Sequence, residues 1–376
     1  MPEEKTHERV STPLTEEMIQ SIPVATSDMS ISELRQLCVR FFRLQNGFVW
    51  TPDASHDYVI RTSKIHKYFE PGIQFGGLPY VSTASGNIYR ALDFMDSEKG
   101  ILHIKEAFED ELLFGTQCAC GADWAWSRVI TSVNGYCWCR QRKHTNGFLR
   151  LGPYTYDDAM EEFTKEYGPK EICRENGKEV MFESYAKMLP GDGVLCWGHV
   201  EMVSSKARVW RNDDGSIDGK KSHVFLCDQG QGWKFSLHPD GTEFRHMGSI
   251  DEFVTFDYLY ETGWLPFTFA EFQGEKKIEK SRISIQLPKH ATVKELKEAK
   301  VISNYPISDL YLVIEEGGKE EYRKAARTRY PYTYSLSLGD AVSEEELSSL
   351  RGKSIKILCR ISTGEKPVIY EGILAE

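Results

Sequence analysis

The chain has 376 residues, 40% of them hydrophobic and 27% charged, and its formal net charge is −10 at pH 7. These fractions are ordinary for a soluble globular protein, and the length exceeds what one core usually serves, so we expect two domains. The acidic balance, without a basic stripe, argues against nucleic acid as a partner, and no stretch approaches the roughly 18 apolar residues of a membrane span.

Residues 1–28 are polar, show no sustained periodicity and are expected to form a flexible leader. They lack the apolar core of a signal peptide. The location is therefore unknown: cell envelope or secreted if a signal peptide was removed from the chain, and otherwise cytoplasmic. Nine cysteines is an odd number, and two pairs have one-residue spacing that disfavours a local disulfide, so we expect mostly thiols.

Helical patterns dominate the first part of the chain. Ser30 or Ser32 can cap a helix that stops at Gly47. The glycine-rich stretch 72–80 is expected to be a loop that ends in Pro79-Tyr80.

The stretch 115–128 is expected to form the central helix of the fold. Opened at Gln117 or Cys118, this helix has one small, apolar face formed by Cys118, Ala122, Ala125 and Val129. A thiol in the first turn lies near unpaired N–H groups and the positive end of the helix dipole, and both favour the nucleophilic thiolate. The alternative is a buried structural cysteine. Cys120 lies about 200° away on a bulkier, more polar face, so Cys118 is the preferred nucleophile.

The later part of the chain alternates at strand period. A Pro-Gly-Asp turn at 190–192 precedes the first of these strands. Helices followed by mainly antiparallel strands are typical of an α+β fold. After a charged link near 273–277, further alternating stretches predict a small all-β sandwich at 277–376. The strand candidates before that link are 194–203, 222–229 and 233–237.

A thiol nucleophile needs a base, and a third polar group that orients the base. His199 lies in the first predicted strand, directly after a glycine that leaves room for a substrate or a helix. The next strand offers Asp228 or Gln229 as the third group. Strand alternation puts Asp228 with Val224, on the face opposite Gln229. The alternative for His199 is a satisfied core histidine.

These residues resemble the NlpC-type cell-wall peptidases, which are papain-like cysteine enzymes. The likeness lies in Gly-x-x-Cys-small at the start of a helix (115–119) and in Pro-Gly-Asp followed by Gly-His-Val. Pro79-Tyr80 is similar to the segment that precedes the nucleophile in that family. Gln117 stands where the family has Asp, and Ala119-Cys120 replaces Ser-Gly. The resemblance covers roughly residues 30–270.

The resemblance implies a papain-like catalytic domain at 29–274, with helices packed on an antiparallel sheet, and leaves 277–376 as an accessory domain. It implies hydrolysis of amide bonds in peptidoglycan stem peptides through a thioester acyl-enzyme, with no cofactor and no metal. In this scheme Cys118 attacks, His199 acts as base and then acid, and Asp228 orients the imidazole. The residues expected to bind the substrate are Tyr80, Gln117 and Trp197.

Three alternatives stay open. In a second register, 117–126 resembles the start of papain's own helix; Asp123 then stands at the nucleophile position and the protein is inactive. Second, the two Cys-x-Cys pairs offer four thiols for a structural zinc ion. Third, the tryptophans would suit a catalytically inactive wall-binding or scaffold protein. The cysteines of the zinc alternative are Cys118, Cys120, Cys137 and Cys139.

Overall fold

The computed structural model describes residues 12–61, 63–81, 86–109, 114–133, 148–157, 163–164, 166–237, 241–316, 319–328, 330–340 and 342–375. The chain divides into two compact units. Unit 1 comprises Met1–Pro23, Asp28–Trp126 and Val133–Lys277. Unit 2 comprises Val24–Ser27, Ser127–Ser132 and Ile278–Glu376. One boundary between the units falls between Lys277 and Ile278.

Helix α2 (Ile31–Gly47) has the predicted bounds. Ser30, rather than Ser32, caps it: the Ser30 hydroxyl accepts from the Glu33 N–H, and the Glu33 carboxylate accepts from the Ser30 N–H. This reciprocal pair satisfies two donors that the first turn leaves open. The other helices of unit 1 are α1 (Glu16–Gln20), α3 (Ile88–Asp93), α4 (Ile104–Glu109), α5 (Cys118–Trp126), α6 (Pro169–Tyr185), α7 (Phe256–Thr262) and α8 (Ala270–Gln273).

Residues 12–28, part of the expected leader, include the short helix α1. Thr15 caps α1 by accepting from the Met18 N–H. Leu14, Ile19 and Ile22 are buried. Burial of three aliphatic side chains gives this stretch a place in the fold, although its polar composition alone predicts none.

A ten-stranded mixed sheet forms the centre of unit 1, in the order β5-β6-β1-β4-β11-β10-β9-β8-β12-β7. Neighbouring strands are antiparallel except at β1–β6 and β4–β11, which are parallel. Helices with a largely antiparallel sheet agree with the predicted α+β class. The strands are β1 (Val49–Pro52), β4 (Gln74–Gly76), β5 (Met95–Asp96), β6 (Ile101–Leu102), β7 (Phe148–Arg150), β8 (Gly193–Cys196), β9 (His199–Val203), β10 (His223–Leu237), β11 (Glu243–Thr255) and β12 (Leu265–Phe269).

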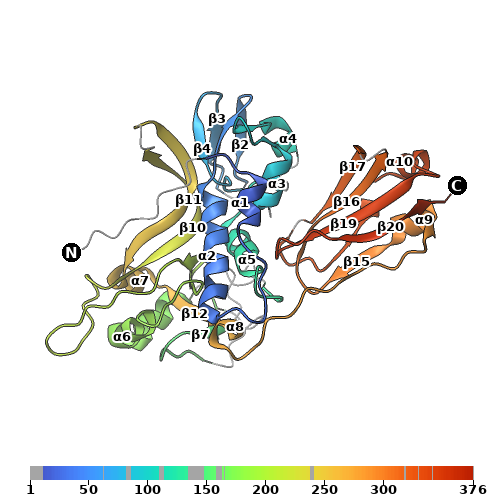
Figure 1. The fold of residues 1–376 in the computed structure, drawn as a ribbon. Coiled ribbons are helices and arrows are strands. Elements are labelled where there is room, and N and C mark those ends of the chain that lie inside the picture. The colour runs from blue at the N-terminus through green and yellow to red at the C-terminus, as the bar shows by residue number, and fades with distance from the viewer. Residues whose placement is uncertain are drawn as a thin grey trace. The chain divides into compact units, whose positions relative to one another are not determined.

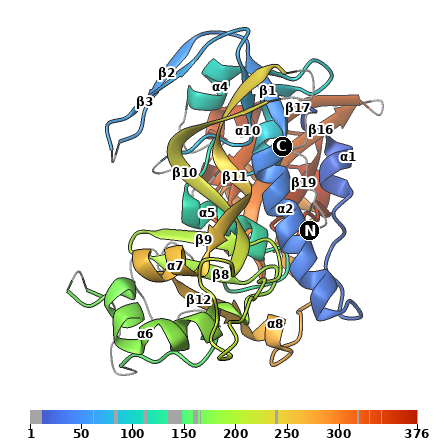
Figure 2. The ribbon, with the colours of Figure 1, turned by 90° about the vertical axis from the view of Figure 1, so that its left-hand side faces the viewer.

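The two longest strands, β10 and β11, form a curved hairpin that stands out in Figure 2. A separate two-stranded ribbon consists of β2 (His56–Val59) and β3 (His66–Phe69).

Helices α2 and α5 lie side by side against the sheet, as Figure 1 shows. A Cβ atom at Gly121 would lie 2.8 Å from Nε2 of Gln45 and 3.4 Å from the Phe42 ring, both on α2, so the two helices are in close contact here. At the other end of α5, the Trp126 indole N–H donates to the carbonyl of Gly191 at 2.7 Å. Helix α5 is therefore fixed at both ends.

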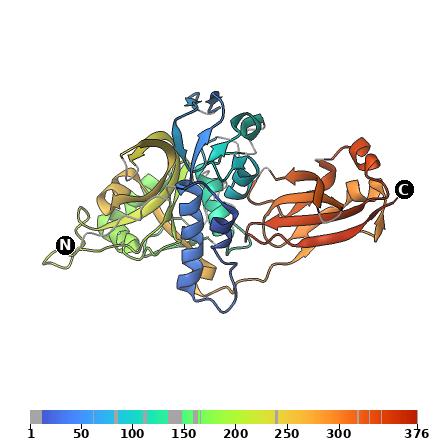
Figure 3. The same cartoon turned by 45° about the horizontal axis from the view of Figure 1, so that its top comes forward.

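Unit 2 contains two sheets, a five-stranded one in the order β14-β20-β19-β16-β17 and a three-stranded one in the order β13-β15-β18. Buried residues of both sheets, among them Val301 and Leu312, belong to one hydrophobic core. The elements of unit 2 are coloured orange to red in Figure 3. The helices are α9 (Val293–Glu298) and α10 (Glu344–Ser349), with a 3-10 turn η2 (Leu338–Asp340). The strands are β13 (Ile283–Ser284), β14 (His290–Ala291), β15 (Lys300–Ser303), β16 (Ile307–Glu316), β17 (Lys319–Arg327), β18 (Ser335–Ser337), β19 (Ser354–Ile361) and β20 (Val368–Leu374).

Candidate functional site

Cys118 is the first residue of α5, within the predicted start of that helix. Its side chain is buried, with a relative exposure of 4% for the residue. Just before it, Thr116 pairs with Tyr80 in a parallel bridge. The N–H of Val81 donates to the Thr116 carbonyl at 2.9 Å, and the N–H of Thr116 donates to the Pro79 carbonyl at 3.0 Å. The backbone thus places the Pro-Tyr segment beside the start of the helix.

Strands β9 and β10 bring three polar side chains to one face of the sheet. Their register pairs Val203 with Leu226 and Met202 with Cys227. Continued by one step, this register sets Glu201 opposite Asp228. Because side chains alternate along a strand, His199 lies on the same face as Glu201.

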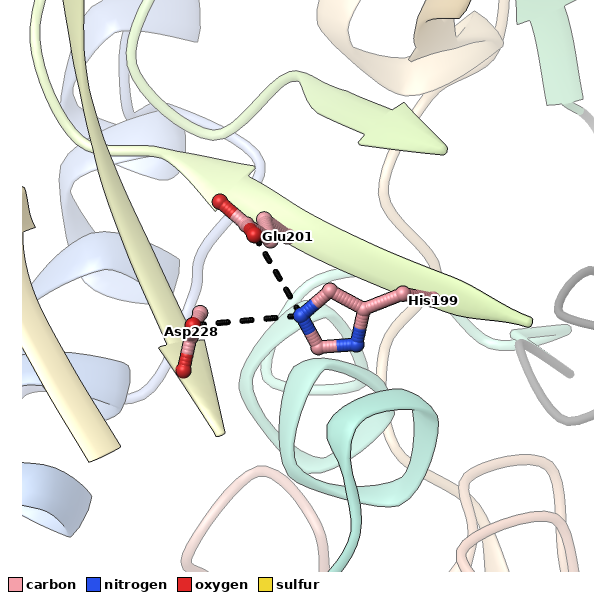
Figure 4. A group of neighbouring side chains, drawn as sticks. All are labelled: His199, Glu201 and Asp228. Carbon is pink, nitrogen blue, oxygen red and sulfur yellow. Dashed lines mark ion pairs between the residues drawn. The ribbon is translucent and has the colours of Figure 1, made fainter. Parts of the chain in front are cut away.

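The imidazole of His199 faces both carboxylates through the same nitrogen, as Figure 4 shows. Its Nε2 lies 3.3 Å from Oε1 of Glu201 and 3.8 Å from Oδ2 of Asp228. Cys118 is also close enough to His199 for its thiol to raise the pKa of the imidazole. The structure therefore brings together the three side chains that the sequence predicts to be catalytic, and adds Glu201.

The surroundings of His199 favour its charged form. Burial lowers the pKa of this imidazole, but its polar contacts with Asp228, Cys118 and Glu201 outweigh burial and raise the pKa well above its ordinary value. The ring of Trp264 covers the imidazole edge-on, with 5.8 Å between the ring centroids. The arrangement holds an imidazolium beside a thiol.

The two carboxylates differ in their electrostatics. Burial raises the pKa of Asp228, yet hydrogen bonding from His199 and the nearby charge of Lys234 outweigh it, so this pKa lies below its ordinary value. For Glu201, burial dominates and raises the pKa, and the charge of Asp228 adds to the effect. Asp228 is therefore the ionised partner of the imidazole, and Glu201 holds a proton more readily.

A lysine from the far end of the hairpin supports the charge on Asp228. Lys234 Nζ lies 3.6 Å from Oδ2 of Asp228 and 2.7 Å from Oε2 of Glu252. Ser249 joins this group by donating from its hydroxyl to Glu252 at 2.6 Å and by accepting from Lys234.

The backbone at Asp228 is held by helix α2. The Asn46 side-chain amide donates to the carbonyls of Asp228 at 2.8 Å and Ser249 at 3.2 Å. A Cβ atom at Gly248 would lie 2.5 Å from the Asn46 side chain, so glycine is required where α2 meets β11. Asn46 thus fixes the strand at the position of the predicted third residue.

The residues predicted to bind the substrate lie around the site with different contacts. Tyr80 is buried, and its hydroxyl accepts from Gln231 at 3.4 Å. The side-chain amide of Gln117 donates to Sγ of Cys120 at 3.3 Å. Trp197 is 44% exposed and follows β8 directly.

Gln229, the sequence alternative to Asp228, points elsewhere. It is fully buried, and its amide donates to the carbonyl of Leu78 at 2.7 Å. This side chain links β10 to the loop before Pro79, whereas Asp228 faces the imidazole.

Two neighbouring cysteines have settings that keep them protonated. Burial, followed by the charge of Asp123, raises the pKa of Cys120. Cys196 pairs with His199 across β8 and β9, and burial raises its pKa to about 12. Asp123 itself is fully buried in the second turn of α5, away from the helix start that the inactive register would require of it.

Donor atoms for a metal also meet at this site. One ligand atom each from His199, Glu201 and Asp228 lie within 4.8 Å of one another. Cys137 and Cys139, half of the predicted four-thiol zinc site, lie outside the described residues.

Sequence reasoning missed Glu201, Lys234, Asn46 and Trp264. The sequence pattern could have indicated Glu201, because a residue two positions from His199 in a strand lies on the same face of the sheet. The other three reach the site from distant parts of the chain. Within the part of the chain that the structure describes, no helix is both long and apolar enough to cross a membrane.

Comparison of the chain with protein-family models, with curated proteins and with solved structures finds no match. The function of this chain is therefore inferred from the residues of its site.

Proposed function

We propose that this protein is a papain-like cysteine hydrolase that cleaves amide bonds in peptidoglycan stem peptides. The observation that supports it best is that Cys118, at the start of α5, lies close enough to His199 to raise the pKa of that imidazole, whose Nε2 faces Asp228. Acyl transfer by a thiol requires a nucleophile beside a base, and an orienting carboxylate on the other side of that base.

The reaction follows from these positions. The Cys118 thiolate attacks the amide carbonyl carbon, forming a C–S bond, and the His199 imidazolium gives its proton to the leaving nitrogen as the C–N bond breaks. Water then attacks the thioester carbon while neutral His199 takes a proton from it, and the C–S bond breaks to return the thiolate. The backbone N–H groups at the start of α5 are suited to stabilise the oxyanion.

The substrate class rests on the resemblance to cell-wall peptidases. Stem peptides are short and carry free carboxylates, which a buried site can select by a few polar groups.

The test is digestion of purified muropeptides and of casein, side by side, with product masses as the readout. We expect new muropeptide products from the native chain and none from the Cys118→Ala variant. Cleavage of casein alone would overturn the substrate class while the cysteine mechanism stands. Inertness toward both, with a folded protein, would overturn the proposal in favour of a non-catalytic wall-binding or scaffold protein.

A further inference from the structure

Glu201 is the feature of the site that a Cys-His-Asp mechanism does not need. It is the carboxylate nearest to Nε2 of His199, at 3.3 Å, and it lies on the same face as Asp228. Two carboxylates directed at one imidazole nitrogen repel each other, and a proton on Nε2 can be donated to one of them at a time.

We propose that His199, Glu201 and Asp228 form a binding site for a zinc ion, and that zinc bound there switches the enzyme off. The second half of this statement rests on the proposed function. The first half is a property of three side chains and can be measured without any substrate.

The spacing of the donor atoms fits zinc. In a tetrahedral site with bonds of about 2.0–2.2 Å, donor atoms lie about 3.3–3.5 Å apart. Here Nε2 lies 3.3 Å from the Glu201 oxygen and 3.8 Å from the Asp228 oxygen, and all three donor atoms lie within 4.8 Å of one another. Binding of one ion would draw the two carboxylate oxygens closer to each other and to Nε2.

The chemistry of the donors points the same way. Imidazole nitrogen with carboxylate oxygen is a common zinc donor set, and three protein ligands leave a fourth position for water. Two carboxylates balance the charge of a divalent cation, which relieves their mutual repulsion.

The burial of Asp228 provides a second, independent observation. This residue is 8% exposed, and within the described part of the chain its Oδ1 has no hydrogen-bond partner. A buried carboxylate oxygen without a donor is costly in a folded protein unless something else occupies it. Asp228 therefore has an oxygen available to a cation besides the one that faces His199.

Zinc at this position would act on catalysis through His199. Binding at Nε2 requires loss of the proton there, which is released to solvent. The carboxylates then bind the ion instead of orienting the imidazole, and His199 can no longer exist as the imidazolium that stabilises the Cys118 thiolate. The active form is the zinc-free one.

The experiment is calorimetric titration of the full chain with zinc chloride, compared with the Glu201→Gln, Asp228→Asn and Cys118→Ser variants. We expect one zinc per native chain, unchanged stoichiometry in Cys118→Ser, and affinity lower by about tenfold or more in each carboxylate variant. Glu252→Gln is the matched control: it removes a neighbouring carboxylate bonded to Lys234 but outside the donor set, and should keep affinity within about threefold.

Circular dichroism is used to check that each variant is folded. Because two carboxylate variants are tested, the site can still be judged if one of them fails to fold. Absence of zinc binding, or binding that is equally strong in Glu201→Gln and Asp228→Asn, would overturn the site. Hydrolysis of muropeptides that zinc inhibits in the native chain supports both proposals. Zinc binding without hydrolysis by the zinc-free chain would refute the proposed function alone, whereas hydrolysis without zinc binding would refute this inference alone.

Discussion

Cys118 and Cys120 are two residues apart, yet they meet opposite environments. The first neighbours His199 and raises the pKa of its imidazole, whereas the second is deeply buried and accepts from Gln117. We expect Cys118→Ser to abolish turnover of muropeptides and Cys120→Ser to retain most of it, because only one of the two thiols has a base. Thermal melting of both variants shows whether they fold. Turnover that survives in Cys118→Ser would remove this cysteine from the mechanism.

The raised pKa of His199 predicts how the thiol reacts with pH. Because this imidazole stays charged above the pH at which an ordinary histidine loses its proton, it stabilises the neighbouring thiolate in neutral and mildly acidic solution. We expect alkylation of Cys118 by iodoacetamide at pH 6, with a chelator present, to be at least about tenfold slower in His199→Ala. The difference should shrink at high pH, where the thiol ionises without help. Equal rates at pH 6, measured by peptide mass, would mean that His199 is not the partner.

Asp228 and Glu201 differ in the charge that they place beside the imidazole of His199. The pKa of Asp228 is lowered and that of Glu201 is raised, so Gln at 201 resembles the protonated native side chain, whereas Asn at 228 removes a charge. In zinc-free buffer we expect Asp228→Asn to lower kcat by about a hundredfold or more and Glu201→Gln to lower it by less than Asp228→Asn. The reverse order would make Glu201 the orienting carboxylate.

At the scale of elements, helix α2 is joined to the sheet by a buried ion pair. Arg35 lies 2.7 Å from Asp192, with side-chain exposures of 5% and 0%. The same guanidinium donates to the carbonyls of Pro190 and Phe272. The Asp of the Pro-Gly-Asp turn, which the resemblance to cell-wall peptidases associates with the catalytic histidine, thus anchors the helix that packs on α5.

Breaking this pair from one side should be costly. We expect Arg35→Met to lower the free energy of unfolding by about 3–5 kcal/mol, because it leaves a buried carboxylate without its cation. Burial already raises the pKa of Asp192. The Arg35→Met/Asp192→Asn double variant should lose less than the Arg35→Met variant. Denaturant unfolding of all variants gives the comparison, and additive losses would contradict a coupled pair.

Local patterns predicted several elements well. The cap at Ser30, the start of α5 and the alternation that separates Asp228 from Gln229 all depend on residues within one turn or one strand. The sheet order and the roles of Asn46, Lys234 and Trp264 depend on contacts between distant parts of the chain, which periodicity does not encode. Glu201 lay within reach of the strand pattern.

At the scale of the molecule, the two units are interleaved in sequence. Unit 2 takes in Ser127–Ser132, the residues that follow α5 in the chain. Their carbonyls accept from hydroxyls of the C-terminal region: Ser127 from Ser362 at 2.8 Å and Thr131 from Tyr334 at 2.6 Å. The sequence pattern places the second domain at 277–376 alone and does not predict this segment as part of it.

A chain that ends at Lys277 therefore loses the partners of the segment after α5. We expect this truncated chain to melt at a lower temperature than the full chain and to turn over muropeptides more slowly. Tyr334→Phe, which deletes one of the hydroxyls, should cost about 1 kcal/mol in the full chain. Equal melting temperatures for the truncated and full chains would show that residues 127–132 need no partner from the C-terminal region.

The hairpin of β10 and β11 has a consequence for how this sequence can change. Between the pairs Gln229–Gly248 and Lys234–His246, four residues of β10 (230–233) lie opposite one of β11, Met247. Asp228 precedes these extra residues of β10 and Lys234 follows them. The length of this stretch sets where Lys234 falls relative to Asp228. Trp233 within it packs against Phe69 and Phe75, and Gln231 donates to the Tyr80 hydroxyl, so evolution of this stretch is constrained both in its length and at these two side chains.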